Sequence, residues 1–227
     1  MKSADVFTGF SPEMFKFFND LKANNYKPWF DEHKHIYLDE VLAPMKAFAT
    51  ALSPAFYAID PKINMNPNKV VSRIYRDIRF SKDKTPYRTN MWMSFQRLLT
   101  DWQRFPGFYL ELYEDGYSYG MGMYMASKKE MDAFRSRVEY QPDEFREMTE
   151  DLIGKHGFEI GGDLYKRRTP SELPEYFQQW IQRKSVYLLK NRPLGKELHD
   201  EGFIEVMASE YLLLKPLYDL FADICEE

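Results

Sequence analysis

The sequence predicts an α+β fold in which a mainly antiparallel sheet is flanked by helices from the N- and C-terminal parts of the chain. Two observations predict this class. Apolar residues recur at helical spacing towards both ends of the chain, whereas they alternate as in β-strands in the middle. The clearest element is FYLELYEDGYSYGMGMYM, residues 108–125, where two aromatic-rich strands flank Asp115 and Gly116. That pair suits the positive φ angles of a tight hairpin turn.

Three long helices are expected at 12–23, 28–52 and 203–224. Ser11 and Pro12 form an N-cap and first-position pair that starts the first helix. Pro28 opens the second helix, and Pro44 is expected to kink it because proline removes a backbone hydrogen bond. Pro216 is expected to bend the last helix in the same way.

Capping patterns predict shorter helices after the hairpin. SKKE, from Ser127 to Glu130, places a glutamate three residues after a serine, which is the pattern of a capping box. TPSE, from Thr169 to Glu172, has the same form. Pro142 suits the first turn of a further helix.

The sheet is expected to contain strands at 91–95, 108–113 and 117–124. KVVSRIYR is β-branched and alternating, which predicts a further strand near Val70. Gly120 and Gly122 share one face of their strand, so their missing side chains leave room for a packed helix, a close backbone or a ligand. The apolar run SVYLLK, residues 185–190, fits either a strand or a helix extension.

Composition favours one α+β domain spanning residues 1–227. The chain is 44% hydrophobic and 17% aromatic, which supports a substantial core, and it has no repeat or Gly/Ser linker. Cys225 is the only cysteine, so we expect no intrachain disulfide and a reducing, cytoplasmic location. The N-terminal sequence does not resemble a signal peptide, and no apolar run approaches the roughly 18 residues of a membrane span. No membrane association is expected.

Charge is unevenly distributed along the chain. The protein carries a net charge of −4, yet six Lys or Arg residues and only two acids lie between Arg73 and Arg88. That stretch therefore carries +4, and the remainder carries −8. An acidic remainder repels a long polyanion, which argues against nucleic acid as a partner, but it affects a small anion at one local site much less. A protein partner stays open.

Metal and nucleotide motifs are absent from the sequence. His33 and His35 lie two apart on a predicted helix and so point in different directions, and no H-E-x-x-H or Cys/His cluster occurs. Neither G-x-G-x-x-G nor G-x-x-x-x-G-K-[ST] is present. We predict no metal ligands and no cofactor, although a carboxylate-bound Mg²⁺ stays open because its ligands can be scattered along a chain.

The candidate site is SRIYRDIRFSKDKTPYRT, residues 72–89, which we call the basic segment. Its polar second half predicts a loop, and arginines beside such a loop can form forked hydrogen bonds to phosphate or carboxylate. We expect a small, phosphate-containing anion to bind there, with or without catalysis. Asp77 is the candidate catalytic residue, as a base, a metal ligand or an orienter of arginine. The candidate ligand-binding residues are Arg73, Arg76, Arg79, Lys84, Tyr87 and, if the second helix packs nearby, Asn25 and Trp29.

The alternative is that the basic segment is a salt-bridged structural clasp in a non-enzymatic interaction protein. Alternation along a strand would place Ile74 and Arg76 on a buried face, with Arg73 and Asp77 on the other. A buried Arg76 would need a carboxylate or backbone partner. Whether the protein is an enzyme is left open at this point.

Two stretches of the sequence resemble the signature of the family known as domain of unknown function 2461. The first follows L-x-x-N-N-x-x-x-W-F, and the second follows R-x-x-R-D-x-R-F-S-x-D-K-T-P-Y. The matching positions are Leu21, Asn24, Asn25, Trp29 and Phe30, then Arg73, Arg76, Asp77, Arg79, Phe80, Ser81, Asp83, Lys84, Thr85, Pro86 and Tyr87. The resemblance covers most of the chain and implies an intracellular α+β domain of bacterial type. It implies no reaction, because that family has no established activity.

Overall fold

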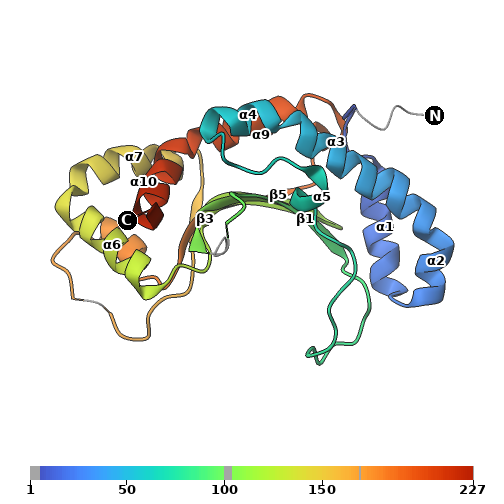
Figure 1. Cartoon of the computed structure of the whole chain (residues 1–227), viewed down its shortest axis with the longest axis horizontal. Coiled ribbons are helices and arrows are strands. Elements are labelled where there is room, and N and C mark those ends of the chain that lie inside the picture. The colour runs from blue at the N-terminus through green and yellow to red at the C-terminus, as the bar shows by residue number, and fades with distance from the viewer. Residues whose placement is uncertain (1–5, 100–103, 169, 227) are drawn as a thin grey trace. The chain divides into compact units, whose positions relative to one another are not determined.

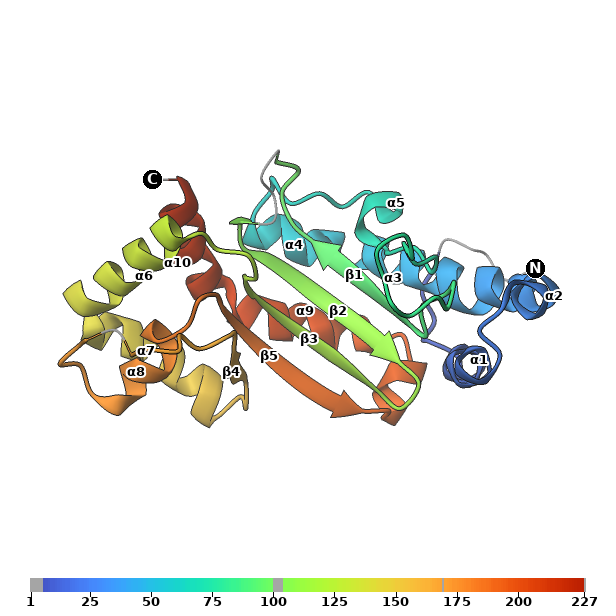
Figure 2. The same ribbon diagram turned by 90° about the horizontal axis from the view of Figure 1, so that it is seen from below.

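The computed structural model describes residues 6–99, 104–168 and 170–226, and it confirms the α+β class (Figure 1). Its five strands form one antiparallel sheet in the order β1-β2-β3-β5-β4, in which β1, β2, β3 and β5 lie side by side (Figure 2). The strands are β1 (Asn90–Phe95), β2 (Gly107–Tyr113), β3 (Gly116–Met123), β4 (Glu159–Gly161) and β5 (Val186–Pro193). In the described parts of the chain, no helix combines the length and apolar character that a bilayer span requires.

The chain divides into two compact units, and each is made of three stretches. The first unit contains Met1–Phe95, Tyr109–Ser118 and Asn191–Ser209. The second contains Gln96–Phe108, Tyr119–Lys190 and Glu210–Glu227. A single domain over residues 1–227 stays a prediction. The basic segment lies wholly within the first unit.

The first unit begins with a run of helical segments, and the first two start beside Ser11 and Pro28 as predicted. The segments are α1 (Pro12–Ala23), α2 (Lys27–Ile36), the π-helical turn η1 (Tyr37–Leu42), α3 (Ala43–Ala51), α4 (Ser53–Ile59) and α5 (Pro67–Val70). The Ser11 hydroxyl accepts a hydrogen bond from the Met14 N–H and caps α1. The expected long second helix is the run α2, η1 and α3, and its irregular turn comes directly before Pro44. Phe56 of α4 stacks on Phe95 of β1, with ring centroids 4.2 Å apart.

The predicted strand near Val70 is wrong, because α5 occupies that position. Asn66 caps α5 by accepting from the Asn68 N–H at 3.0 Å, and Pro67 fills the first helical turn. This local capping outweighs the β-branched character of KVV. The residues that follow α5 pair with β1 through an isolated antiparallel bridge between Val71 and Met93, and Ser72 forms hydrogen bonds with Trp92 beside it.

The predicted hairpin is confirmed, but its turn lies one residue earlier than expected. Glu114 and Asp115 form the turn, and Gly116 already belongs to β3. The positive φ expected for this pair is wrong, since among the described residues only three glycines elsewhere have it. A side chain at Gly116 would instead lie 2.6 Å from the Arg192 carbonyl oxygen. The glycine is therefore needed for close backbone approach and not for a left-handed turn.

The second unit combines helices with β4 and β5. Its helices include α6 (Lys128–Tyr140), α7 (Pro142–Gly154), α8 (Glu175–Ile181) and α10 (Lys215–Glu226). The capping box before α6 is confirmed, since Glu130 accepts from the Ser127 N–H at 2.6 Å. The predicted cap at 169–172 is wrong, because α8 begins only after Pro174; Thr169 itself lies outside the described residues.

The two open points about the later strands are resolved within the second unit. The run SVYLLK is part of β5. Gly120 admits a close backbone, since a side chain there would overlap the carbonyl oxygen of Leu188. The predicted C-terminal helix consists of α9 (Phe203–Leu213) and α10, which are separated at Leu214, two residues before Pro216.

Candidate functional site

The basic segment forms a loop whose two arms are joined at its base. The Arg76 N–H donates to the Pro86 carbonyl at 2.9 Å, and the Arg88 N–H donates to the Ile74 carbonyl at 2.8 Å. Tyr75 and Tyr87 form an isolated antiparallel bridge between the same arms. The loop extends away from β1 (Figure 1). The two arms of the loop are therefore paired where they leave the rest of the first unit, at residues 74–76 and 86–88.

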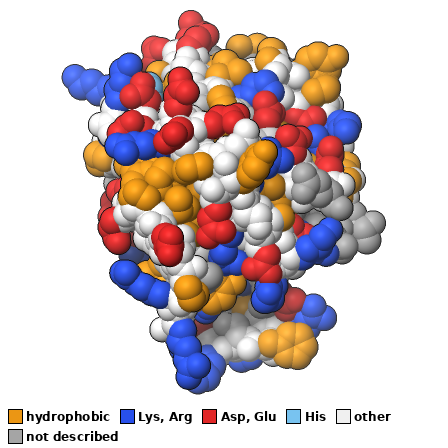
Figure 3. Space-filling view, turned by 90° about the vertical axis from the view of Figure 1, so that its left-hand side faces the viewer, with side chains coloured by type: hydrophobic (Ala, Val, Ile, Leu, Met, Phe, Trp, Pro, Cys, Tyr) orange, Lys and Arg blue, Asp and Glu red, His pale blue; other side chains and the backbone are white. Residues whose placement is uncertain are grey.

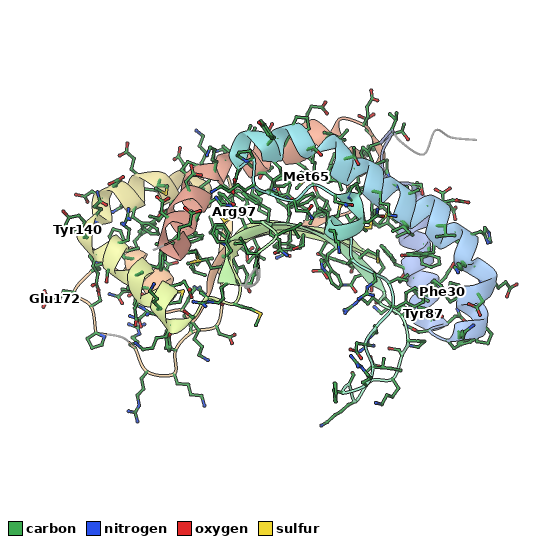
Figure 4. All side chains as sticks on the ribbon, in the orientation of Figure 1. Phe30, Met65, Tyr87, Arg97, Tyr140 and Glu172 are labelled. Carbon is green, nitrogen blue, oxygen red and sulfur yellow. The ribbon has the colours of Figure 1, made fainter. Side chains whose placement is uncertain are left out.

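Aromatic stacking fixes the base of the loop to α2. Phe30 is fully buried and stacks on Tyr87, with ring centroids 4.0 Å apart and an interplanar angle of 18° (Figure 4). Tyr75 meets the same Phe30 ring edge-on at 5.8 Å. Burial raises the pKa of the Tyr87 phenol. The ring of Tyr87 therefore acts mainly as a packing surface.

Asn25 holds the returning arm through its side-chain amide. Its Nδ2 donates to the Tyr87 carbonyl at 2.9 Å, and its Oδ1 accepts from the Tyr87 N–H at 3.0 Å. These paired bonds satisfy the backbone of a residue that is only 4% exposed. The two signature stretches, whose nearest matching residues Phe30 and Arg73 are 43 positions apart in the sequence, therefore form one structural unit.

Arg76 has the carboxylate partner that its partial burial requires. Its Nη1 donates to Asp83 and to the Thr85 hydroxyl. Asp83 also accepts from the Thr85 N–H at 2.9 Å. These contacts lower the pKa of Asp83 to about 2, and the hydrogen bond from Arg76 has the largest effect. Asp83 is therefore ionised at neutral pH and neutralises Arg76.

Asp77 is engaged with Arg79 on the exposed side of the loop. Arg79 Nε donates to Asp77 Oδ1 at 2.9 Å, and its Nη2 donates to Oδ2 at 2.7 Å. This forked pair lowers the pKa of Asp77 and raises that of Arg79. Lys84 donates to the Ile78 carbonyl at 2.9 Å. All these groups are paired within the loop itself.

A cavity of about 350 Å³ lies between the end of α1, the arms of the basic segment and the start of β1, and we call it the motif cavity. Its lining residues are Lys22, Asn25, Arg76, Asp83, Thr85, Tyr87, Arg88, Thr89 and Asn90. Three of these are cations and one is an acid. The lining therefore carries a net positive charge.

The three lining cations differ in how they are partnered. Lys22 pairs with Glu114, which raises the pKa of the lysine and lowers that of the glutamate, and Arg76 pairs with Asp83. Arg88 has no carboxylate partner among the described residues. Its guanidinium carbon lies 4.5 Å from the centroid of the Trp92 ring, and its Nε is buried without a hydrogen-bond partner. A buried N–H of this kind is rare and costs free energy.

The structure brings together some of the residues that the sequence predicts. Asn25, Arg76 and Tyr87 line the motif cavity, whereas five other predicted residues do not: Arg73, Asp77, Arg79, Lys84 and Trp29. Trp29 stacks on His33, with ring centroids 4.1 Å apart. Arg73 is exposed.

Sequence reasoning missed the other lining residues: Lys22, Asp83, Thr85, Arg88, Thr89 and Asn90. Lys22 and Arg88 both stand inside or directly beside the two signature stretches, which is the signal that could have found them. Among the described residues, no group of three or more His, Cys, Asp or Glu side chains is placed to hold a metal ion.

These features define an α+β protein whose two signature stretches pack together around a polar, cationic cavity. The chain belongs to the family of conserved hypothetical proteins called DUF2461, whose model matches residues 13–220 and so includes both stretches. No curated protein matches the chain.

Proposed function

We propose that the motif cavity binds a small anionic ligand, with a phosphate group as the preferred anion and Arg88 as its main donor. The observation that carries this proposal is the state of Arg88. Its guanidinium group lines a polar cavity, has no acidic partner among the described residues, and keeps an unsatisfied buried Nε. An oxyanion in the cavity would give the Arg88 guanidinium the anionic partner that it lacks among the described residues. The planar fork of arginine suits phosphate or carboxylate oxygens.

The remaining lining residues support a small and polar ligand. Lys22 and Arg76 are paired with Glu114 and Asp83, so Arg88 is the lining cation whose charge is left for a ligand. The hydroxyl of Thr89, which also lines the cavity, is a further donor, whereas that of Thr85 already donates to Asp83 at 2.9 Å. A volume of about 350 Å³ is near the lower end of the roughly 300–1,000 Å³ of ligand pockets. A sugar phosphate or a similar metabolite fits this size better than a polymer.

Binding is better supported than catalysis. A general base works best when its pKa lies near the working pH. The carboxylate in the lining, Asp83, has a pKa of about 2 and is a weak base. Asp77 is occupied by Arg79 and lies outside the lining.

The second candidate is the structural clasp in a non-enzymatic interaction protein. One observation favours it: Arg76, Arg79 and Lys84 all end on acceptors of the basic segment itself. The two candidate functions differ in the role that they give Arg88. The clasp gives it no ligand, whereas the binding proposal makes it the residue on which affinity depends.

A ligand screen with two matched arginine variants tests the proposal. Thermal shift would be measured with inorganic phosphate, sugar phosphates, nucleotides and phospholipid head groups, at low and high salt. The wild type and Arg79→Gln should be stabilised by at least one of these anions, because Arg79 is exposed and lies outside the cavity. Arg88→Gln should lose that response while remaining folded by circular dichroism. A ligand at about 100 times its dissociation constant adds about 2.7 kcal/mol, so the shift is measurable. No stabilisation of the wild type by any anion would favour the clasp.

A further inference from the structure

The far end of the basic segment presents an exposed aromatic ring among cations. Phe80 is 94% exposed, which is the highest value for a large hydrophobic side chain in the described residues. The Arg79 guanidinium lies 5.8 Å from its ring centroid, and Lys82 is exposed and unpaired within the described part of the chain. A single exposed phenylalanine is ordinary on a protein surface. This one differs because the loop that carries it is held in place.

Internal bonds give the loop a defined conformation. The Arg76–Asp83 pair ties its two arms together, and Lys84 reaches back to the Ile78 carbonyl. Arg79 is fixed beside the ring by its forked pair with Asp77. A group that is already ordered loses less conformational entropy on binding. Because the loop is already ordered, the Phe80 ring can enter an apolar cavity at a small entropic cost.

An apolar hollow with an acidic rim lies elsewhere on the same unit. It measures about 290 Å³, and its apolar walls include Val6, Phe7, Ala43 and Pro44. An engineered apolar cavity of about 150 Å³ already accepts benzene, so a phenyl ring fits. Phe7 packs on Phe48, with ring centroids 4.7 Å apart, which fixes the N-terminal wall. We call this hollow the N-terminal cavity.

The rim of the N-terminal cavity comes from the π-helical turn η1. Asp39 and Glu40 both line the cavity, and neither has a cationic partner in the described ranges. The Ser11 hydroxyl donates to Glu40 at 2.7 Å and holds that carboxylate at the rim. Single π-turns inserted in α-helices frequently mark functional positions. The hollow thus offers an apolar floor and two carboxylates that no cation of the described residues neutralises.

We propose that Phe80 of one molecule docks into the N-terminal cavity of a second copy of the chain. The ring would fill the apolar floor, while Lys82, which has no partner among the described residues, would face Asp39 and Glu40. Opposite charges around an apolar anchor are the pattern of a complementary interface. A second copy is preferred to a polyanion because the chain outside the stretch from Arg73 to Arg88 carries −8.

The ring and the hollow are different surfaces of one chain. Two copies can therefore pair reciprocally as a two-fold dimer, or a one-way contact can run on into rings or open chains. One aromatic anchor makes a weak interface, for which we expect a dissociation constant of roughly 10 μM to 1 mM. This inference is independent of the proposed anion site.

Sedimentation velocity over a concentration series tests the contact. The wild type should associate as its concentration rises, and Phe80→Ala should weaken association by about tenfold or more. Tyr57→Ala is the matched control, because Tyr57 is another aromatic of the first unit and is 71% exposed. It should associate like the wild type. Ala43→Trp, which fills the hollow, should behave like Phe80→Ala.

Mixing variants tests whether the ring of one copy binds the hollow of another. Phe80→Ala keeps the hollow and Ala43→Trp keeps the ring, so a mixture of the two should form a capped heterodimer that grows no further. Asp39→Lys provides a second hollow variant if Ala43→Trp does not fold, and Lys82→Glu should partly restore its binding. A wild type that stays monomeric at about 1 mM overturns the proposal. It is also overturned if Phe80→Ala associates normally, or if the ring binds anionic vesicles while self-association is absent.

Discussion

Replacing Asn25 with alanine should destabilise the first unit by releasing the basic segment from the turn after α1. The Asn25 side chain donates to the Tyr87 carbonyl and accepts from the Tyr87 N–H, at 2.9 and 3.0 Å. Both bonds join groups that are 62 residues apart in the chain. Among the hydrogen bonds of the described residues, the Tyr87 N–H and carbonyl are joined to Asn25 and to no other side chain. The variant removes both bonds and leaves two backbone groups of a buried residue without partners.

The magnitude follows from the number of bonds and from their burial. A typical hydrogen bond contributes about 0.5–1.5 kcal/mol, and an orphaned buried group costs about 1–3 kcal/mol. Asn25 also lines the motif cavity, so water there can reach part of the exposed backbone. We therefore expect a loss of about 2–3 kcal/mol in the free energy of unfolding. Asn24→Ala is the control, because Asn24 makes one exposed bond, to the Asp20 carbonyl.

Two measurements would show the effect: urea denaturation for the free energy of unfolding, and hydrogen exchange in native buffer for the Tyr87 amide. The unfolding midpoint of Asn25→Ala should fall well below that of Asn24→Ala, and the Tyr87 amide should exchange faster in native buffer. Exchange localises the change even if the two units unfold separately. Equal midpoints for the two variants, with an unchanged Tyr87 amide, would refute the reasoning.

Three further predictions concern charge and backbone packing. In an NMR titration the Asp83 carboxyl should have a pKa of about 2, and Arg76→Ala should move it back towards 3.8. Because this pKa is depressed, the stability that the pair contributes is present above about pH 4 and is lost as pH falls towards 2. Asp77→Asn should leave the urea midpoint close to that of the wild type, because its pair with Arg79 is exposed; a large loss would support the structural clasp. Gly120→Ala should lower the melting temperature strongly, since the new side chain would overlap a carbonyl oxygen of β5, whereas Gly154→Ala should not, since nothing lies within 4 Å. Equal melting temperatures for these two variants would contradict the packing argument.

Elements with local signals could be predicted from the sequence. The cap at Ser11 and the capping box at Ser127 act within one helical turn, so their residues identify both helix starts. The same physics explains the wrong strand near Val70. There the Asn66 cap and Pro67 determine the local structure, and the β-branched pattern does not.

The candidate site could be predicted only in part because its contacts are long-range. The sequence indicates the basic segment through its charge, yet nothing local shows that Arg76 and Arg79 are neutralised inside the loop while Arg88 is not. The sequence predicts Asn25 as a ligand-binding residue, but no local signal shows that its amide, beside the motif cavity, also holds the Tyr87 backbone. Such pairings depend on which residues the fold brings together, and spacing along the chain does not encode them.

The central claim is that the motif cavity holds an oxyanion on Arg88. Anomalous diffraction from crystals soaked in selenate would test it most directly, because the selenium atom marks the anion position. We predict an anomalous peak in the motif cavity, within hydrogen-bond reach of the Arg88 guanidinium, that disappears in crystals of Arg88→Gln. Peaks only at exposed cations such as Arg73 and Lys82, with none in the cavity, would contradict the account.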